Sequence, residues 1–362
     1  MLEKRVANVQ QLMRDNNVDY MLLAPTPNMF YLTGLETSPD ERLQLLIVPG
    51  EGPLEVVIPE MYAETAEEKG DKFNLHTWAD HENPVEIVGD IVRAEEGGAI
   101  AVDQKMWAGH FLSIKPLFQG CSFVDANLIM SPARVIKDSR ELELLKEAGE
   151  LADQVMELAA QEIRVGLMER ELVLFIENKL KTLGAEGLSF SPIVASGPNA
   201  SSPHHIPGDR QFEKGDFIVL DFGGKVGGYC SDITRTFCIG EASNKAKQVH
   251  RIVQEANEKG YFASTAGTPC EDVDRAAREV IDQAGYGEYF IHRTGHGIGL
   301  DCHEDPYIVE GNTTLLEQGM TFSIEPGIYL PGEMGVRIED IAAVTEEGPV
   351  RFNNFPRGLI EL

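Results

Sequence analysis

Apolar and polar residues alternate in two different ways along the first 125 positions of the chain. Leu2, Val6, Val9, Leu12 and Met13 recur at helical spacing, which predicts an amphipathic helix over about the first 20 residues. Four short apolar runs with the length of buried strands follow: DYMLLAP, LQLLIVP, LEVVIP and AIAVD. Because helical stretches alternate with these runs, the pattern predicts an α/β domain that ends at about residue 125.

The segment SPARVIKDSRELELLKEAGELADQVMELAAQEI, residues 131–163, has the pattern of a long helix. Asp138 and Ser139 are typical helix-start residues, and Glu141 and Glu143 put negative charge into the first turn. We therefore place a domain boundary near residue 130. The chain then consists of a smaller domain, residues 1–130, and a larger one, residues 131–362.

The larger domain contains an internal repeat. Two helix-length segments, 166–184 and 267–285, each begin and end with glycine. Each is followed further along the chain by a turn and a short apolar strand, EKGDFIVLDFG at 213–223 and EQGMTFSIEPG at 317–327. Such self-similarity indicates two halves with the same succession of helix and strands.

The repeat places four carboxylates at equivalent positions. Its aligned strands put Asp221 opposite Glu325, and the chain then returns through GYCSDIT and GVRIEDI. In each returning segment a carboxylate stands four residues after a glycine, at Asp232 and Glu339. Acids gathered in apolar strands repel one another and would protonate unless a cation neutralised them.

Divalent metal ions account best for this arrangement. Few basic residues lie nearby in the sequence, namely Lys225, Arg235 and Arg337. Four carboxylates and one imidazole suit a pair of ions about 3.5–4 Å apart. The oxygen-rich ligand set favours manganese or cobalt, with zinc and iron as further candidates.

The stretch HRTGHGIGLDCHEDP, residues 292–306, offers the histidine for such a site. His292 and His296 have the spacing of the HExxH zinc motif, but no glutamate follows His292. Three glycines also disfavour a helix here, so we reject that motif. In an extended chain the two histidines share a face, and the spacing does not choose between them.

Composition narrows the function classes. The net charge of -28, from 59 acidic and 31 basic residues, argues against a nucleic-acid partner and against an anionic membrane surface. The N-terminus lacks the apolar stretch of a signal peptide, and no apolar run approaches the length of a membrane span. Five cysteines without CxxC spacing are typical of reduced thiols, so we expect a cytoplasmic protein.

Three motifs together resemble the metallopeptidases of the "pita-bread" fold, and more closely their proline-specific branch. They are VLDFGGKVGGYCSDITRTF, GHGIGLDCHEDP and GMTFSIEPGIYLPGEMGVRIED. The resemblance covers nearly the whole chain. It implies an α+β fold, in which a C-terminal pita-bread domain with a pseudo-twofold internal repeat is preceded by a smaller α/β domain. It also implies a homodimer.

The resemblance assigns roles to particular residues. It implies five ligands for two metal ions: Asp221, Asp232, His296, Glu325 and Glu339. It implies further site residues: His204, His292, His303 and Arg337. Glu325 would carry a proton to the leaving proline nitrogen, and His204 and His303 would donate hydrogen bonds to the substrate or the tetrahedral intermediate. Arg337 would hold a substrate carboxylate or orient the ligands. We interpret His205 as part of a polar loop, and Cys230 and Cys302 as packing residues.

The function implied is hydrolysis of the peptide bond before proline, by a hydroxide that bridges the two metal ions. The modest length favours an Xaa-Pro dipeptidase (prolidase) over an Xaa-Pro aminopeptidase acting on longer peptides. Methionine aminopeptidases usually lack the N-terminal domain, and creatinase-like hydrolases lack the complete ligand set. A non-enzymatic interaction module is the remote alternative, since such members typically lose ligands.

Overall fold

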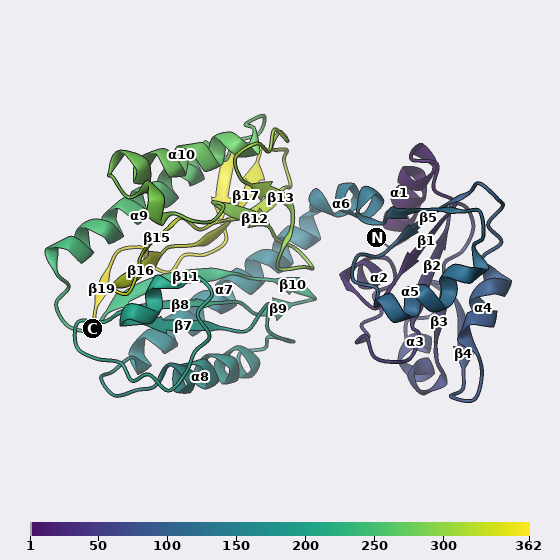
Figure 1. The fold of residues 1–362 in the computed structure, drawn as a ribbon, viewed down its shortest axis with the longest axis horizontal. Coiled ribbons are helices and arrows are strands. Elements are labelled where there is room, and N and C mark those ends of the chain that lie inside the picture. Colours follow the sequence, from purple (N-terminus) through teal and green to yellow (C-terminus); the bar gives the residue numbers. More distant parts are fainter. Residues whose placement is uncertain (1) are drawn as a thin grey trace. The chain divides into compact units, whose positions relative to one another are not determined.

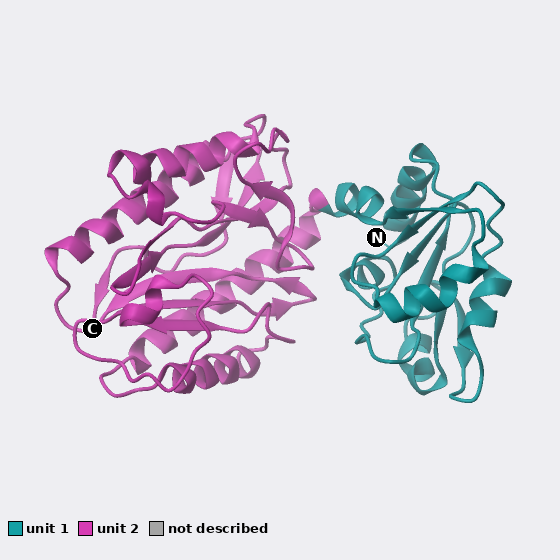
Figure 2. Cartoon of the chain, in the orientation of Figure 1, with its two compact units in different colours: residues 1–134 teal, residues 135–362 magenta. Residues whose placement is uncertain are grey.

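The computed structural model describes residues 2–362. The chain divides into two compact units, residues 1–134 and residues 135–362 (Figure 2). The position near residue 130 that the sequence suggested for the boundary lies in helix α6 (Asn127–Val135), in which the two units meet along the chain. Within residues 2–362, no helix has the length and apolar character needed to cross a membrane.

Unit 1 is built around one mixed sheet with the strand order β4-β3-β2-β1-β5-β6. Its strands are β1 (Tyr20–Leu23), β2 (Leu45–Pro49), β3 (Glu55–Pro59), β4 (Asn74–Trp78), β5 (Ala99–Val102) and β6 (Ser122–Asp125). Its helices are α1 (Leu2–Asp15), α2 (Pro27–Thr33), α3 (Ala63–Glu67), α4 (Pro84–Ile91), α5 (Ala108–Ile114) and α6, with 3₁₀ turns η1 (Glu60–Tyr62) and η2 (Lys115–Leu117). The β1–β5, β3–β4 and β5–β6 pairs are parallel, and the other two are antiparallel.

The apolar pattern predicted the central strands of this sheet and missed its edges. The four apolar runs form β1, β2, β3 and β5, and the predicted first helix is α1, which ends at Asp15 and buries Val9 and Met13. Strands β4 and β6 were not predicted. Both are edge strands with mostly exposed or half-buried residues, so their sequences carry no continuous apolar run.

Unit 2 contains the long helix that the sequence predicted. Asp138 caps helix α7, since its carboxylate accepts the backbone N–H groups of Arg140 and Glu141, and the carboxylate of Glu141 accepts the N–H of Asp138. The helices of unit 2 are α7 (Ser139–Glu162), α8 (Glu169–Thr182), α9 (Asn244–Ala263) and α10 (Cys270–Gln283), with 3₁₀ turns η3 (Gly197–Ser201) and η4 (Gly287–Tyr289).

The strands of unit 2 form two larger sheets and two hairpins. One sheet has the order β19-β11-β8-β7, and the other β13-β12-β14-β17-β18. The first sheet consists of β7 (Ile193–Ser196), β8 (Phe217–Phe222), β11 (Ile233–Cys238) and β19 (Ile360–Glu361). The second consists of β12 (Gly295–Gly297), β13 (Glu304–Ile308), β14 (Thr321–Ile324), β17 (Asp340–Thr345) and β18 (Gly348–Arg351). The hairpins pair β9 (Lys225–Val226) with β10 (Tyr229–Cys230), and β15 (Gly327–Leu330) with β16 (Met334–Arg337).

The internal repeat appears in the structure as two equivalent halves. In each half a helix, α8 or α10, precedes an antiparallel strand pair, β8–β11 or β14–β17. The glycines that bound the repeated helices all have positive φ: 87° at Gly166, 109° at Gly184, 86° at Gly267 and 81° at Gly285. Because only glycine adopts this conformation without strain, the glycine spacing marks the start and end of each helix.

The two halves meet along their strands. Figure 1 shows the strands of unit 2 between the helix pair α9–α10 and helix α8. Thr234 of β11 forms an isolated antiparallel bridge with Glu339, and the N–H of Glu339 donates to the carbonyl of Thr234 at 3.1 Å. This bridge joins the returning segment of one half to that of the other, and the acids of both halves line one cavity.

Candidate metal centre and active site

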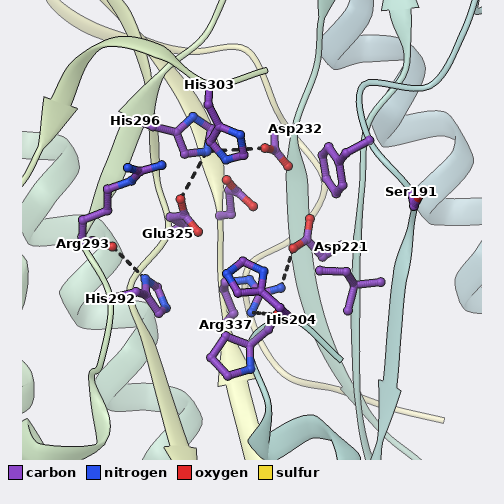
Figure 3. Close-up of a pocket in the computed structure, with 14 residues that line it drawn as sticks. Ser191, His204, Asp221, Asp232, His292, Arg293, His296, His303, Glu325 and Arg337 are labelled. Carbon is purple, nitrogen blue, oxygen red and sulfur yellow. Dashed lines mark hydrogen bonds and ion pairs between the residues drawn. The ribbon is translucent and has the colours of Figure 1, made fainter. Parts of the chain in front are cut away.

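A cavity of about 600 Å³ opens in unit 2 between the two halves of the repeat (Figure 3). Fourteen residues line it: Phe190, Ser191, Ile193, Pro203, His204, Asp221, Asp232, His292, Arg293, His296, His303, Glu325, Arg337 and Glu339. Every site residue that the sequence suggested is among them. The repeat and the resemblance therefore selected residues that the fold brings to one place.

The first half contributes two aspartates. Asp221 lies in β8, whose six residues are all buried, and it stands opposite Thr234 of β11. Asp232 directly precedes β11 and is 4% exposed. The guanidinium of Arg337 pairs with one oxygen of Asp221, so one basic group does offset part of the negative charge. Arg235 instead pairs with Asp340 at 2.7 Å, away from the cavity lining.

The second half contributes two glutamates and the histidine. Glu325 follows β14, Glu339 lies between β16 and β17, and His296 is the middle residue of the short strand β12. The Nε2 atom of His296 is 3.3 Å from Oε1 of Glu325 and 3.7 Å from Oδ2 of Asp232. Donor atoms of Asp232, His296 and Glu339 lie within 4.8 Å of one another, which is the arrangement of a metal-binding group.

The protonation state of His296 leaves a lone pair pointing at the acids. Burial lowers the pKa of His296 to about 3, so its imidazole is neutral. Its Nδ1 lies 3.1 Å from the carbonyl oxygen of Gly297, and therefore Nδ1 carries the proton and donates it there. The unprotonated Nε2 then faces two carboxylates, Asp232 and Glu325, to which it cannot donate. A cation between these atoms would satisfy all three.

Three of the carboxylates keep one oxygen without a hydrogen-bond partner among residues 2–362, and burial favours the neutral forms of Asp232 and Glu339. Burial raises the pKa of Asp232 well above its usual value, and the neighbouring Glu339, Asp221 and Glu325 raise it further. Burial likewise raises the pKa of Glu339 well above its usual value and that of Glu325 to about 7. Within the described residues, one oxygen each of Asp221, Asp232 and Glu339 is buried without a hydrogen-bond partner. Buried polar atoms are rarely left unpaired, so the donor set fits divalent metal ions.

His292, which the sequence could not distinguish from His296, has other partners. Its Nδ1 is 2.7 Å from the carbonyl oxygen of Arg293, and its Nε2 is 2.9 Å from the hydroxyl of Tyr329. Because burial lowers the pKa of His292 to about 4, the ring is neutral, Nδ1 donates, and the hydroxyl of Tyr329 donates to Nε2. The same hydroxyl accepts from Arg337 at 2.8 Å. His292 thus positions Tyr329 and Arg337 beside the acids.

The other two candidate histidines are exposed at the cavity. The ring of His303 lies 4.0 Å from that of His296, centroid to centroid. His204 follows η3 in a loop that also places Pro203 at the cavity, where the carbonyl of Pro203 accepts from Arg337 at 3.4 Å. His205, interpreted as a polar loop residue, is half-buried and bonds to Glu169 at 2.8 Å.

Sequence reasoning missed several residues around the cavity. Phe190, Ser191, Ile193, Pro203 and Arg293 line it without belonging to the repeat alignment. Arg293 lies inside the histidine-rich stretch, so its place in that motif could have indicated that it lines the cavity. The others become neighbours only through the tertiary fold.

The two cysteines near the site are buried, as the packing interpretation requires. Burial raises the pKa of Cys230 to about 11 and that of Cys302 well above its usual value, so neither thiol is ionised near neutral pH. The Sγ of Cys302 lies 3.5 Å from Oδ2 of Asp232.

Sequence comparison identifies the family. Residues 143–346 match metallopeptidase family M24. The chain belongs to metallopeptidase family M24. Residues 5–136 match the creatinase/prolidase N-terminal domain, which is the second part of the M24 architecture predicted from the motifs. The matches confirm both the resemblance and the fold, and as an M24 member the chain is a metallopeptidase.

Several M24-type proteins are similar over the full length. A prolidase structure from Thermococcus sibiricus is 42% identical, with a TM-score of 0.96 over 100% of this chain and 99% of its own. A dipeptidase structure from Pyrococcus horikoshii OT3 is 41% identical, with a TM-score of 0.94 over 99% and 100%. An X-Pro aminopeptidase structure from Thermotoga maritima MSB8 is 32% identical, with a TM-score of 0.84 over 97% and 100%. A Bacillus subtilis (strain 168) protein named as a dipeptidase is 38% identical over 361 residues, 99% of each chain.

Proposed function

We propose that this M24 metallopeptidase is an Xaa-Pro dipeptidase that uses two divalent metal ions, manganese or cobalt. The observation that supports it most is the set of unpartnered groups in the cavity: three carboxylate oxygens and the lone pair of His296. The similarity to proteins named prolidase and dipeptidase supports the substrate class. The ligands in this proposal are Asp221, Asp232, His296, Glu325 and Glu339.

A peptide bond before proline makes particular demands on the enzyme. Its nitrogen carries no hydrogen, and the proline ring prevents the extended fit that other proteases use. When bound, the metal ions supply an activated water and polarise the scissile carbonyl. The chain's own residues must orient the peptide and give a proton to the proline nitrogen as it leaves.

The residues at the cavity can meet these demands. Glu325 would carry a proton to the leaving nitrogen, because its carboxylate lines the cavity and a carboxyl group can both accept and release a proton there. His204 and His303, exposed at the cavity, would donate hydrogen bonds to the substrate carbonyl or the tetrahedral intermediate. Arg337 is held by Asp221 and Tyr329, so its proposed role is to orient the ligands.

The experiment compares three peptides with the protein loaded with manganese or cobalt. Cleavage of Ala-Pro alone would establish the dipeptidase. Preference for Ala-Pro-Ala would establish an Xaa-Pro aminopeptidase, and preference for Met-Ala-Ala would overturn the proline branch. The Glu325→Gln variant should be inactive in every case. If the wild-type protein binds metal but cuts none of the peptides, the result would contradict the peptidase proposal and favour the non-enzymatic interaction module. The homodimer and the cytoplasmic location stay predictions.

A further inference from the structure

A buried carboxylate outside the cavity connects to the loop that carries His204. Glu169 is the first residue of α8 and is fully buried. Its two oxygens are surrounded by donors from residues 196–208. Oε1 accepts from the N–H of Ser196 (2.9 Å), the hydroxyl of Ser196 (2.7 Å) and the amide of Asn199 (3.0 Å). Oε2 accepts from Nε2 of His205 (2.8 Å) and the N–H of Gly208 (3.2 Å).

These donors make the charged form of Glu169 the stable one. Burial alone would raise the pKa of Glu169, but hydrogen bonds from Ser196, Asn199 and His205 outweigh that effect and lower it. Each oxygen serves a different part of the loop, the start through Oε1 and the end through Oε2. A glutamine of the same size would replace one oxygen with an NH₂ group, which cannot accept, so one end of the loop would lose its anchor.

The middle of the same loop lies against the site. The hydroxyl of Ser201 accepts the N–H of Gly332 at 3.2 Å, and the carbonyl of Pro203 accepts from Arg337 at 3.4 Å. His204 is the next residue and lines the cavity (Figure 3). His204 itself is exposed, and within residues 2–362 its side chain makes no hydrogen bond. Its direction therefore depends on the backbone on either side of it.

We propose that Glu169 is a positioning residue for His204. By holding both ends of residues 196–208, its carboxylate fixes the backbone so that the His204 imidazole faces the scissile carbonyl. Next to His204, the side chain of His205 donates to the Glu169 carboxylate and so anchors the chain at that position. The inference rests on the proposed function, since it takes the substrate-facing role of His204 from there.

A double-mutant cycle tests this coupling. We expect Glu169→Gln to lower kcat on Ala-Pro at least ~10-fold, because a misplaced group near the reacting atoms loses much of its effect. In a His204→Ala background, the same substitution should change kcat less than about twofold, since residues that act as a unit are not additive. Metal content should stay at the wild-type level, because Glu169 contacts none of the proposed ligands. Equal losses in both backgrounds would overturn the proposal.

A matched control comes from the same helix turn. Within residues 2–362, the carboxylate of Glu171 accepts the N–H of Met168 at 2.9 Å and the residue is exposed, so Glu171→Gln should leave kcat unchanged. If Glu169→Gln does not fold, His205→Gln provides the second variant, because it keeps the buried carboxylate and a side-chain N–H donor. It should show the same dependence on His204 with a smaller loss.

Hydrogen–deuterium exchange of the metal-free protein separates this proposal from the proposed function. In Glu169→Gln, exchange should become faster in residues 196–208 and stay unchanged in the strands that carry the acids. Unchanged exchange in the loop would overturn the proposal whatever the activity. If the wild-type protein cut no Xaa-Pro peptide, the proposed function would fail, and the exchange result would still decide whether Glu169 holds the loop.

Discussion

Single hydrogen bonds around the proposed ligands decide how those ligands are oriented. The hydroxyl of Thr234 donates to Oε2 of Glu339 at 2.6 Å and accepts from Nε of Arg337 at 3.2 Å. Thr234, from the first half of the repeat, thereby fixes the direction of the Glu339 carboxylate, which belongs to the second half. Mutation of a residue that orients a metal ligand commonly lowers the metal affinity by about 10–100-fold. The sequence pointed to Glu339 and Arg337, but gave no sign of the threonine between them.

We predict that Thr234→Val lowers manganese affinity by about tenfold or more. Valine has a similar shape but offers neither donor nor acceptor, so Glu339 loses the hydroxyl that donates to its Oε2, and Nε of Arg337 loses the oxygen to which it donates. Titration of the metal-free protein with Mn²⁺ in a calorimeter measures the change.

Thr321→Val is the matched control for that experiment. Thr321 is also fully buried, but its hydroxyl donates to the backbone carbonyl of Ile298 at 2.6 Å. Loss of this hydrogen bond should lower the free energy of unfolding by about 1 kcal/mol and leave the metal affinity unchanged. Equal affinity losses in the two variants would show that Thr234 has no special role in orienting Glu339.

At the scale of elements, close backbone contacts bring the pieces of the site together. Strand β16 carries Arg337 at its end and packs against η3, which begins the His204 loop. A Cβ placed on Gly335 would lie 1.8 Å from the carbonyl oxygen of Ala200. Only a residue without a side chain allows the strand and the turn to come this close.

Gly335→Ala should therefore separate β16 from η3. We expect a loss of about 1–3 kcal/mol in the free energy of unfolding and slower peptide hydrolysis, because the backbone atoms in conflict cannot rotate away. Gly208→Ala is the control in the same loop, since a Cβ there meets no atom within 4 Å. Urea unfolding and kcat on Ala-Pro measure both effects. A Gly335→Ala protein as stable and active as Gly208→Ala would contradict the steric argument.

Helix α9 contains a buried histidine whose protonation opposes folding. Burial, aided by the charge of Arg235, lowers the pKa of His250 from 6.5 to about 4. Above pH 6.5 the imidazole is neutral in both folded and unfolded chains and contributes nothing. As the pH falls from 6.5 towards 4, only the unfolded chain takes up the proton, so stability is lost across that window.

We predict that this histidine removes about 2 kcal/mol of stability between pH 7.5 and pH 5. The His250→Leu variant should lose correspondingly less over the same interval. Urea unfolding of the metal-free proteins at the two pH values gives the comparison, with His81→Gln as the control at an exposed position. An identical pH dependence in wild type and His250→Leu would rule out this contribution.

At the scale of the whole molecule, the two units differ in what stabilises them. Among the described residues, the metal-binding group of Asp232, His296 and Glu339 lies in unit 2. Unit 2 buries several carboxylates close together, whose mutual repulsion opposes folding until a cation binds.

Manganese should therefore stabilise unit 2 and leave unit 1 unchanged. At a free concentration of 100 times Kd, a single ion adds about 2.7 kcal/mol to the free energy of unfolding. Thermal unfolding with and without Mn²⁺ measures the total effect, and hydrogen exchange assigns it to residues 135–362 or to residues 1–134. Equal protection of both units would contradict a metal site confined to unit 2, and EDTA should reverse the effect.

Local signals in the sequence were enough to predict several elements and part of the site. Periodicity and capping gave α1 and α7, glycine spacing gave the repeated helices, and the repeat singled out four acids that line one cavity. These features depend on residues close together in the chain. The apolar pattern did not predict the edge strands β4 and β6, because exposed strands need no apolar run.

The tertiary structure decided what local patterns leave open. In the fold, His296 lies among the carboxylates, whereas His292 is hydrogen-bonded to Tyr329. The spacing of the two histidines in the sequence could not distinguish these roles. The tertiary structure also supplied Thr234, and it brought Glu169 to His205 across 36 positions of sequence. The physical reason is the same in each case. A hydrogen bond between distant segments depends on how whole strands and helices pack, and no short stretch of sequence contains that information.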